Sequence, residues 1–395
     1  MAAMDSPTSK ASPAEEEGRP PLRIAALCLT LWKLGRAWVF RGTLLVLACL
    51  LAMALLIRYR AESNLLSIFL AYFPALVMAL PLLGTLLASL VFLCWRSALL
   101  SAFSAIIIVL WLGGFSFSLR QHTDQARGSD TLSVMTYNRG QGSEAVLASC
   151  ASANQPDIAV FQDAGRRLGR LAALPAFAQH HYTYQSGEYG LLSRWPLVEN
   201  EALQLDWPAG KTGYWLAGTR SVIDWNGRRI VIYNIHFPTP RDLLYWYAKR
   251  GTFLYGLLGL LPGTPLHARH QHYLAYWSAR VGLAAQLNAR VRAESSPVIL
   301  MGDLNVPPLG SGYGLLRAVL HDAHQAAGTG FGFTFPSNFK SLGRHFAPWI
   351  RIDHIFASAH WEVLSCASPS KETSQHLPVA ALLKFIDKNY AKDTK

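Results

Sequence analysis

Three long uncharged stretches occupy the first third of the chain. They extend from Gly42 to Ile57, from Leu65 to Trp95 and from Ser97 to Leu119. A helix of about 20 apolar residues crosses the hydrocarbon core of a bilayer. The third stretch has this length, the first reaches it by including residues 37–41, and the second is longer and contains two prolines. The pattern predicts about three transmembrane helices between residues 37 and 120, with two as the alternative.

The residues around these stretches predict an orientation in the membrane. Residues 1–36 form the predicted N-terminal tail, disordered or interfacial, since residues 1–21 mix Ser, Pro, Ala and Glu without periodicity. A cleaved signal peptide is the competing interpretation, but no small-residue cleavage site follows Ile57 and two more apolar stretches come after it. Basic residues are slightly more numerous on the side of the N-terminus. We therefore expect a multi-pass protein of the cell membrane, with its C-terminal domain on the non-cytoplasmic side.

Beyond a polar linker at residues 121–130, the hydrophobic pattern changes to short runs. Their length and composition are typical of buried strands, and they cover residues 132–137, 158–161, 230–235, 298–301, 352–356 and 378–383. Helical patterning covers residues 144–153 and 276–293. Residues 131–395 are therefore predicted to form a mixed α/β domain, large enough to bury a sizeable core.

Polar side chains appear where the predicted strands end or are interrupted. They are Asn138, Gln162, Asp163, His236, Asp303, Asn305, Asp353, His354, Ser374, Gln375 and His376. If the strands lie side by side in packed sheets, their ends converge on one edge and form an oxygen-rich cluster with two histidines. Oxygen ligands without a thiolate are the set that a hard cation prefers, which predicts Mg²⁺ or Mn²⁺ as the cofactor. His354 lies inside an apolar run and is interpreted as a structural core residue.

Composition and charge add two constraints. Hydrophobic residues make up 51% of the chain and charged residues 15%, which is too apolar for a purely soluble enzyme. The net charge of +12 suits an anionic membrane surface or a phosphate-bearing substrate, although a general contribution to solubility explains it equally well. The five cysteines show no metal-type spacing, and a disulfide between Cys150 and Cys366 is possible without being required.

The order of the motifs TYN, FQD, YNIHF, LMGDLN, RIDHIF and SQH resembles the motif series of the endonuclease/exonuclease/phosphatase superfamily. The resemblance covers residues 131–386, and YGLLSRWPL matches a family strand interpreted as mainly structural. It implies a deoxyribonuclease-like α/β/β/α sandwich of two face-to-face sheets, with one or two divalent ions at one end. The apolar N-terminal stretches add a resemblance to membrane-anchored bacterial members associated with glycopeptide resistance, some of which are thought to act on polyprenyl pyrophosphate.

The resemblance implies a set of metal ligands. Asn138 and Asp163 would hold the metal, and Asp303, Asn305 and Gln375 are further candidate ligands. This sequence departs from the family pattern at two of these positions. Position 163 is usually Glu, which is one methylene longer, and the residue before the last histidine is usually acidic. The amide of Gln375 can coordinate but adds no negative charge, so a lower metal affinity or the loss of a second ion is expected.

The resemblance also implies the catalytic roles. Asp303 would orient or deprotonate the attacking water, and Asn305 would hold the phosphate or the metal. His376, paired with Asp353, would face the negative charge that develops on phosphorus. His236 matches the histidine thought to protonate the leaving oxygen in the deoxyribonuclease and sphingomyelinase branches. Phosphoryl transfer needs such positioning, charge neutralisation and an acid for the leaving group.

The segment from Asp242 to Leu261 combines aromatic, aliphatic and basic residues, among them Tyr245, Trp246 and Tyr247. This combination is typical of a membrane interface, and a helical hairpin packed on the domain's own surface is the alternative. The sequence therefore predicts a membrane-anchored phosphomonoesterase or phosphodiesterase, with membrane lipids as partners and a lipid-linked or membrane-proximal phosphate as substrate. A membrane-tethered nuclease and a weakly catalytic phosphate-binding module, the latter suggested by Gln375, are the alternatives.

Overall fold

The computed structural model describes residues 20–118, 128–140, 144–207, 214–240, 253–337, 347–368 and 374–386. The chain divides into two compact units. The first comprises residues 1–48 and 81–105, and the second comprises residues 49–80 and 106–395. The second unit contains both β-sheets.

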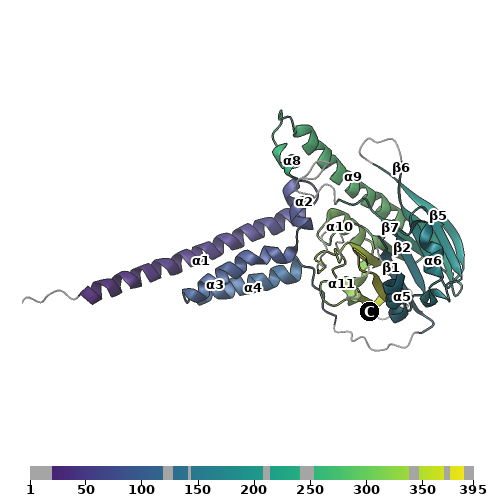
Figure 1. The fold of residues 1–395 in the computed structure, drawn as a ribbon, viewed down its shortest axis with the longest axis horizontal. Helices are drawn as coiled ribbons and strands as arrows, with labels where there is room; N and C mark the ends of the chain where they lie inside the picture. The colour runs from purple at the N-terminus through teal and green to yellow at the C-terminus, as the bar shows by residue number, and fades with distance from the viewer. Residues whose placement is uncertain are drawn as a thin grey trace, which may run out of the picture. The chain divides into compact units, whose positions relative to one another are not determined.

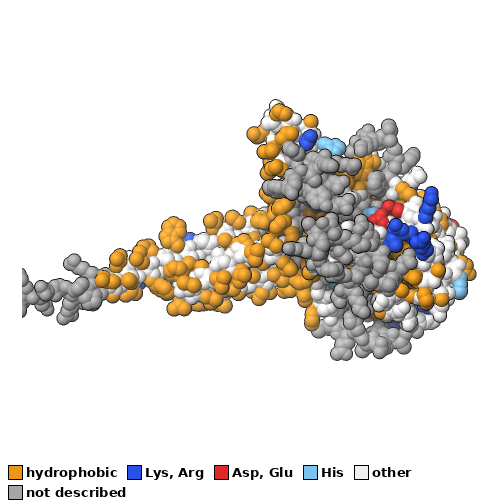
Figure 2. All heavy atoms as spheres, viewed as in Figure 1, with side chains coloured by type: hydrophobic (Ala, Val, Ile, Leu, Met, Phe, Trp, Pro, Cys, Tyr) orange, Lys and Arg blue, Asp and Glu red, His pale blue; other side chains and the backbone are white. Residues whose placement is uncertain are grey.

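Apolar helices make up the described part of the first unit. They are the N-terminal portion of α1 (Pro20–Arg60), α3 (Leu80–Val91) apart from its first residue, and the N-terminal portion of α4 (Trp95–Trp111). Inside this unit the Trp32 and Phe92 rings pack with centroids 5.2 Å apart, and the Thr85 and Ser101 hydroxyls form a 2.8 Å hydrogen bond. Most of the large apolar side chains on these helices are exposed, as Figure 2 shows. Exposed apolar surface of this extent marks a surface that contacts lipid or another protein.

The expected number of about three spans requires correction. Among the described residues, one helix, covering Ile24–Arg60 within α1, is long and apolar enough to cross a membrane. A second passes only if α2 (Leu65–Tyr72) and the helical residues Leu76–Val91 count as one broken span, and α4 is shorter than a span. The long uncharged second stretch was misleading because apolar composition does not separate contact with lipid from burial in protein. In α2, six of the eight residues are buried.

Helix α1 begins at Pro20 and therefore includes residues 20–36, which were assigned to the N-terminal tail, while residues 1–19 lie outside the described part. The predicted linker at residues 121–130 lies mostly outside it as well. Among the described residues before β1, Ser116 forms an antiparallel bridge with Gly330 in the second unit.

Two six-stranded sheets form the centre of the second unit. The first has the order β11-β12-β1-β2-β4-β3, and the second has the order β5-β6-β7-β8-β10-β9. The strands of the first sheet are β1 (Thr131–Asn138), β2 (Ile158–Gln162), β3 (Tyr182–Ser186), β4 (Tyr189–Ser193), β11 (Trp361–Ala367) and β12 (Val379–Phe385). Those of the second are β5 (Leu197–Asp206), β6 (Tyr214–Trp225), β7 (Arg228–His236), β8 (Val298–Asp303), β9 (His321–Asp322) and β10 (Asp353–Ala357).

Alternating apolar residues on these strands fill three layers of core. On β7, Ile230 and Ile232 face the core between the two sheets, whereas Val231 and Tyr233 belong to the core beneath the helices. This alternation follows from the two-residue period of a strand. A strand with apolar residues at every position is therefore buried on both faces, which explains the uninterrupted apolar runs in the sequence.

Helices cover the outer face of each sheet (Figure 1). Helices α9 (His267–Arg292) and α10 (Ser311–Arg317) pack on the second sheet through residues such as Leu283, Leu287 and Leu316. Helices α5 (Glu144–Asn154) and α6 (Leu168–Ala172), with the 3-10 turns η2 (Gly165–Arg167) and η3 (Pro175–Phe177), pack on the first. The other helical elements among the described residues are η1 (Ala75–Ala79), α8 (Phe253–Leu258) and α11 (Ala323–Ala327). The predicted α/β/β/α sandwich is thereby confirmed.

The cysteines take no part in covalent bonding. All five are free thiols, and Cys150 and Cys366 are buried in different core layers. Burial raises the pKa of Cys150 to about 11 and that of Cys366 to about 12, so both stay protonated at neutral pH. The disulfide considered from the sequence does not form.

Candidate functional site

Strand register brings the predicted polar residues together at one end of the sandwich. In the second sheet, Asp303 at the end of β8 pairs with His236 at the end of β7 and with Asp353 at the start of β10. In the first sheet, Asn138 at the end of β1 pairs with Gln162 at the end of β2. Neighbouring strands lie about 4.8 Å apart, so residues far apart in the sequence become direct neighbours.

Asp303 is at the centre of the cluster. It accepts a 2.8 Å hydrogen bond from Nδ2 of Asn138 at Oδ2, which is 3.4 Å from Nε2 of His236 and 3.7 Å from Nε2 of His376. Burial raises the pKa of the Asp303 carboxyl, and the nearby Asp353 adds to this, although His376 and His236 oppose it. Asp303 therefore sits where it could exchange a proton with a water molecule in the site.

His376 forms a buried pair with Asp353. Its Nδ1 lies 2.9 Å from Oδ2 and 3.2 Å from Oδ1 of that carboxylate. Burial opposes the charged imidazolium, but the charges of Asp353 and Asp303 outweigh this effect and raise the pKa of His376 above its ordinary value. The ring also packs against Phe335, with centroids 4.8 Å apart. The protonated, positively charged form of His376 is therefore favoured beside Asp303.

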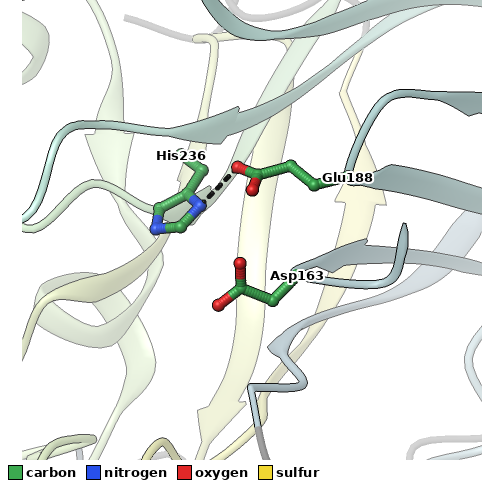
Figure 3. A group of neighbouring side chains, drawn as sticks. All are labelled: Asp163, Glu188 and His236. Atoms are coloured by element: carbon green, nitrogen blue, oxygen red, sulfur yellow. Dashed lines mark hydrogen bonds and ion pairs between the residues drawn. The ribbon is translucent and has the colours of Figure 1, made fainter.

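A second group, Asp163, Glu188 and His236, lies next to the first (Figure 3). Nδ1 of His236 lies 2.7 Å from Oε1 of Glu188, and the Asp163 carboxylate is directed toward the same space. Burial opposes the charge on His236, but the hydrogen bond to Glu188 and the charge of Asp303 outweigh it and raise the pKa of His236 to about 9. For Glu188, burial is similarly outweighed by the bond to His236, which lowers its pKa. The pair is thus ionic at neutral pH and can donate a proton.

Glu188 was not identified from the sequence. It occupies the turn between β3 and β4, immediately before the strand Tyr189–Ser193 that was interpreted as mainly structural. A turn Glu is usually solvated, so the residue alone carries no signal. The one clue in the sequence is that Glu188 directly precedes a strand of the motif series. In the structure its carboxylate lies beside His236.

The oxygens around Asn138 suit a divalent cation. Oδ1 of Asn138 is buried and has no hydrogen-bond partner in the described part of the chain, while Nδ2 of the same amide is bound to Asp303. Burial and the charge of Glu188 raise the pKa of Asp163, and a bound cation would favour its ionised form. Asn138, Asp163 and Glu188 therefore offer the hard oxygen donors that Mg²⁺ or Mn²⁺ requires.

Asn305 and Gln375 complete the predicted set. Asn305 adopts a left-handed backbone with φ of 52°, and its Nδ2 donates to the Phe237 carbonyl, which leaves Oδ1 for a ligand. Gln375 lines the same cavity and its backbone carbonyl accepts a hydrogen bond from Ser337. His354 faces away from this cavity, donating toward the Val306 carbonyl at 2.9 Å inside the domain, as its structural interpretation requires.

These residues line a cavity of about 510 Å³ whose lining combines polar and apolar side chains. Its polar residues include Asn138, Asp163, His236, Asp303, Asn305, Gln375 and His376. Its apolar and aromatic residues include Phe335, Trp349, Ile350 and Ile352 together with Phe69, Tyr72, Phe73 and Pro74. The last four come from α2 and the residues after it, so a segment predicted to lie in the membrane contributes to this site.

Residues 138–376 match the model of the Endonuclease/Exonuclease/phosphatase family, which is more than half of the chain. Members of this family hydrolyse phosphoester bonds and generally use divalent metals. The chain belongs to the endonuclease/exonuclease/phosphatase family, as its motif order predicted. The resemblance to members associated with glycopeptide resistance stays a prediction.

Several solved structures are similar to this chain. One is an endonuclease/exonuclease/phosphatase family protein from Bacteroides thetaiotaomicron, 18% identical, with a TM-score of 0.46 over 65% of this chain and 98% of that one. Another is the mannosyl-6-phosphatase of Bacteroides thetaiotaomicron VPI-5482, 19% identical, with a TM-score of 0.45 over 64% and 100%. A third is truncated TDP2 from Caenorhabditis elegans, 17% identical, with a TM-score of 0.44 over 65% and 99%. No curated protein sequence matches the chain.

Proposed function

We propose that this protein is a membrane-anchored, Mg²⁺- or Mn²⁺-dependent hydrolase that removes or cleaves the phosphate of an amphiphilic, lipid-linked substrate. The observation that carries the proposal is the mixed lining of the cavity, which the phosphohydrolase residues share with Phe69, Phe73 and Pro74, called the apolar wall below. The polar residues suit a phosphate group, and the apolar wall suits a hydrocarbon chain. A substrate without an apolar portion would leave that wall in contact with water.

The surface around α8 supports the same substrate class. Leu257, Leu258, Leu260 and Leu261 are between 41% and 70% exposed, whereas Gly256 of this helix is buried, with the side chains of Leu65 and Tyr273 beside it. This short helix thus rests on the domain and still presents leucines to the outside, which suits the surface of a bilayer. The aromatic residues Tyr245, Trp246 and Tyr247 of this segment lie outside the described residues.

The chain's own residues support a hydrolytic reaction. Asp303 would accept or orient the proton of the attacking water, and the His376–Asp353 pair would stabilise negative charge on the phosphate oxygens. The His236–Glu188 pair would donate a proton to the leaving oxygen. A cation held by Asn138 and Asp163 would draw negative charge from a phosphate oxygen when bound. Gln375 in place of an acidic residue favours a single ion over two.

The direct test compares substrates that share a phosphate but differ in the apolar chain. Full-length protein in detergent micelles should release phosphate or headgroup from a long-chain lipid phosphate faster than from a short-chain analogue, and a chelator should abolish both reactions. Phe69→Ser with Phe73→Ser should raise KM for the long-chain substrate alone. Leu66→Ser, which alters the exposed face of the same helix α2, is the matched control.

Metal-dependent degradation of DNA or RNA without any lipid turnover would establish the nuclease alternative, and phosphate binding without turnover would establish the binding module.

We further propose that α1 anchors the protein with the hydrolase domain on the non-cytoplasmic side. The support is the long apolar helix Ile24–Arg60 and the excess of basic residues near the N-terminus. Protease added to the outside of spheroplasts should then digest the domain. Full protection from a protease shown to be active would reverse the orientation.

A further inference from the structure

A buried polar network lies beneath the loop that carries Asn305. Arg280 on α9 is 1% exposed, and its guanidinium donates three hydrogen bonds. Nε donates to the Pro238 carbonyl at 3.0 Å, Nη1 to the Tyr72 hydroxyl at 2.9 Å, and Nη2 to the Asn305 carbonyl at 2.6 Å. One side chain thereby connects the residues that follow β7, those that follow β8, and helix α2.

The other end of the network lies between α1 and α2. The Tyr72 hydroxyl is 3.1 Å both from Oε1 of Glu62 and from the Asn305 carbonyl oxygen. Glu62 is 4% exposed, and its Oε2 accepts from the amide of Gly312 at 3.3 Å. Glu62 and Arg280 are 3.9 Å apart, so the two charges partly compensate each other inside the protein. All of these residues belong to the second unit.

Asn305 depends on this network for its position. Its backbone is left-handed, its amide donates to Oδ1 of Asp303 at 2.9 Å, and its side-chain nitrogen donates to Phe237 at 2.9 Å. The carbonyl oxygen is the remaining backbone group, and it is held by Arg280 and Tyr72. Removing these donors would free the peptide that sets the direction of the Asn305 side chain toward the cavity.

Stability alone does not account for such a network. Burying an arginine and a glutamate carries a large desolvation cost, and apolar residues of similar size often stabilise a fold equally well or better. A planar guanidinium, however, fixes three acceptors in a set geometry that neither an apolar side chain nor a lysine reproduces. The arrangement therefore suits the fixing of a loop more than the gain of folding free energy.

We propose that Arg280 is a positioning residue for hydrolysis, with Tyr72 and Glu62 as its supports. The segment from Glu62 to Tyr72 then completes the catalytic site in addition to attaching it to the membrane. This inference rests on the proposed hydrolytic function. The contribution of Glu62 and Tyr72 to turnover then applies even to substrates without an apolar chain. The proposed contribution of the apolar wall, in contrast, applies only to substrates that have such a chain.

A second Arg–Glu–Tyr network in the same domain provides matched controls. Arg220 on β6 donates from Nε to Oε1 of Glu294 at 2.6 Å, and the Tyr233 hydroxyl donates to the same oxygen at 2.6 Å. None of these three residues lines the catalytic cavity. Arg220→Lys and Tyr233→Phe therefore remove comparable bonds without touching the loop that carries Asn305.

The experiment uses the full chain and a short-chain soluble phosphoester. Arg280→Lys is expected to lower kcat by roughly 10- to 100-fold, since a displacement of about 1 Å at a reacting group can cost about 10²-fold in rate. KM should change little. Tyr72→Phe should lower kcat by a smaller factor, and the two control variants should keep kcat near that of the unchanged protein even where they lower the Tm. Mn²⁺ binding, followed by electron paramagnetic resonance, should weaken in Arg280→Lys and not in Arg220→Lys.

Equal kcat losses in Arg280→Lys and Arg220→Lys, both folded, would overturn the proposal. If Arg280→Lys does not fold, the comparison of Tyr72→Phe with Tyr233→Phe decides in the same way. If the unchanged protein binds Mn²⁺ but hydrolyses no phosphoester, the proposed function fails, and the Mn²⁺ measurement still tests whether Arg280 positions the loop.

Discussion

Two histidine–carboxylate pairs approach Asp303, and each pair joins one sheet to the other. His376, just before β12, pairs with Asp353 on β10, and its partner carboxylate is only 1% exposed. His236 on β7 pairs with Glu188 in the turn before β4, and this carboxylate is 41% exposed. The first pair is almost wholly buried, so solvent screens its charges only weakly. The second can exchange its proton with solvent between turnovers, which a proton donor must do.

The largest expected effect comes from removing the residue that both pairs share. Asp303→Ala should lower kcat by roughly 10³-fold or more while the protein remains folded, because the group acts on the transition state. His376→Ala should act in the same direction. Steady-state kinetics on any accepted phosphoester, with circular dichroism as the folding control, measures this. If either variant kept metal-dependent turnover close to that of the unchanged protein, the catalytic role assigned to that residue would be wrong.

Asp353→Asn tests whether the buried pair supplies a fixed charge. The neutral amide should lower the charge on His376 and reduce kcat by about 10²-fold, and it should also lower the Tm because the buried imidazole loses its ionic partner. The matched change in the more exposed His236–Glu188 pair, Glu188→Gln, should reduce kcat by about tenfold at neutral pH. The Tm should change little, because an exposed ion pair contributes little to stability. Similar losses of Tm in the two variants would contradict the comparison.

The His236–Glu188 pair also predicts how the pH profile of kcat/KM should change. Glu188 helps to raise the pKa of His236 to about 9, so His236 stays protonated, and able to donate, up to alkaline pH. Glu188→Gln removes this contribution, and the alkaline limb of kcat/KM should move toward lower pH at constant metal concentration. An unchanged alkaline limb, measured in the same buffers for both proteins, would argue against His236 as the proton donor.

The smallest expected effect concerns Gln375, which precedes the buried histidine. Gln375→Asp restores the acidic residue usual in the family and should tighten the apparent affinity for Mg²⁺ by a few-fold, about 1 kcal/mol or less. Titration of activity with Mg²⁺ measures the change, and the conservative variant Gln375→Asn serves as control. A weaker affinity in Gln375→Asp would place this side chain away from the ion.

The sequence predicted the sheet residues of the site because strand ends mark them. Asn138, Asp163 and Asp303 follow apolar runs, and pairing between strands then places such ends together. Glu188 was not predicted, because a turn residue carries no periodic pattern. The contribution of Phe69 and Tyr72 to the site was not predicted either, because an apolar helix that packs on a domain has the same composition as one that crosses a bilayer.

The left-handed backbone at Asp163 and Asn305, where φ is 52° in both, has a consequence for how this chain can vary. This conformation costs most side chains about 1 kcal/mol or more, whereas Asn, Asp and Gly adopt it readily. In a library of all substitutions selected for folding alone, these two positions should accept mainly those three residues. The Glu usual at position 163 would then be disfavoured in this loop. The left-handed backbone at position 163 thus disfavours Glu, whereas metal binding requires a carboxylate. Asp satisfies both requirements.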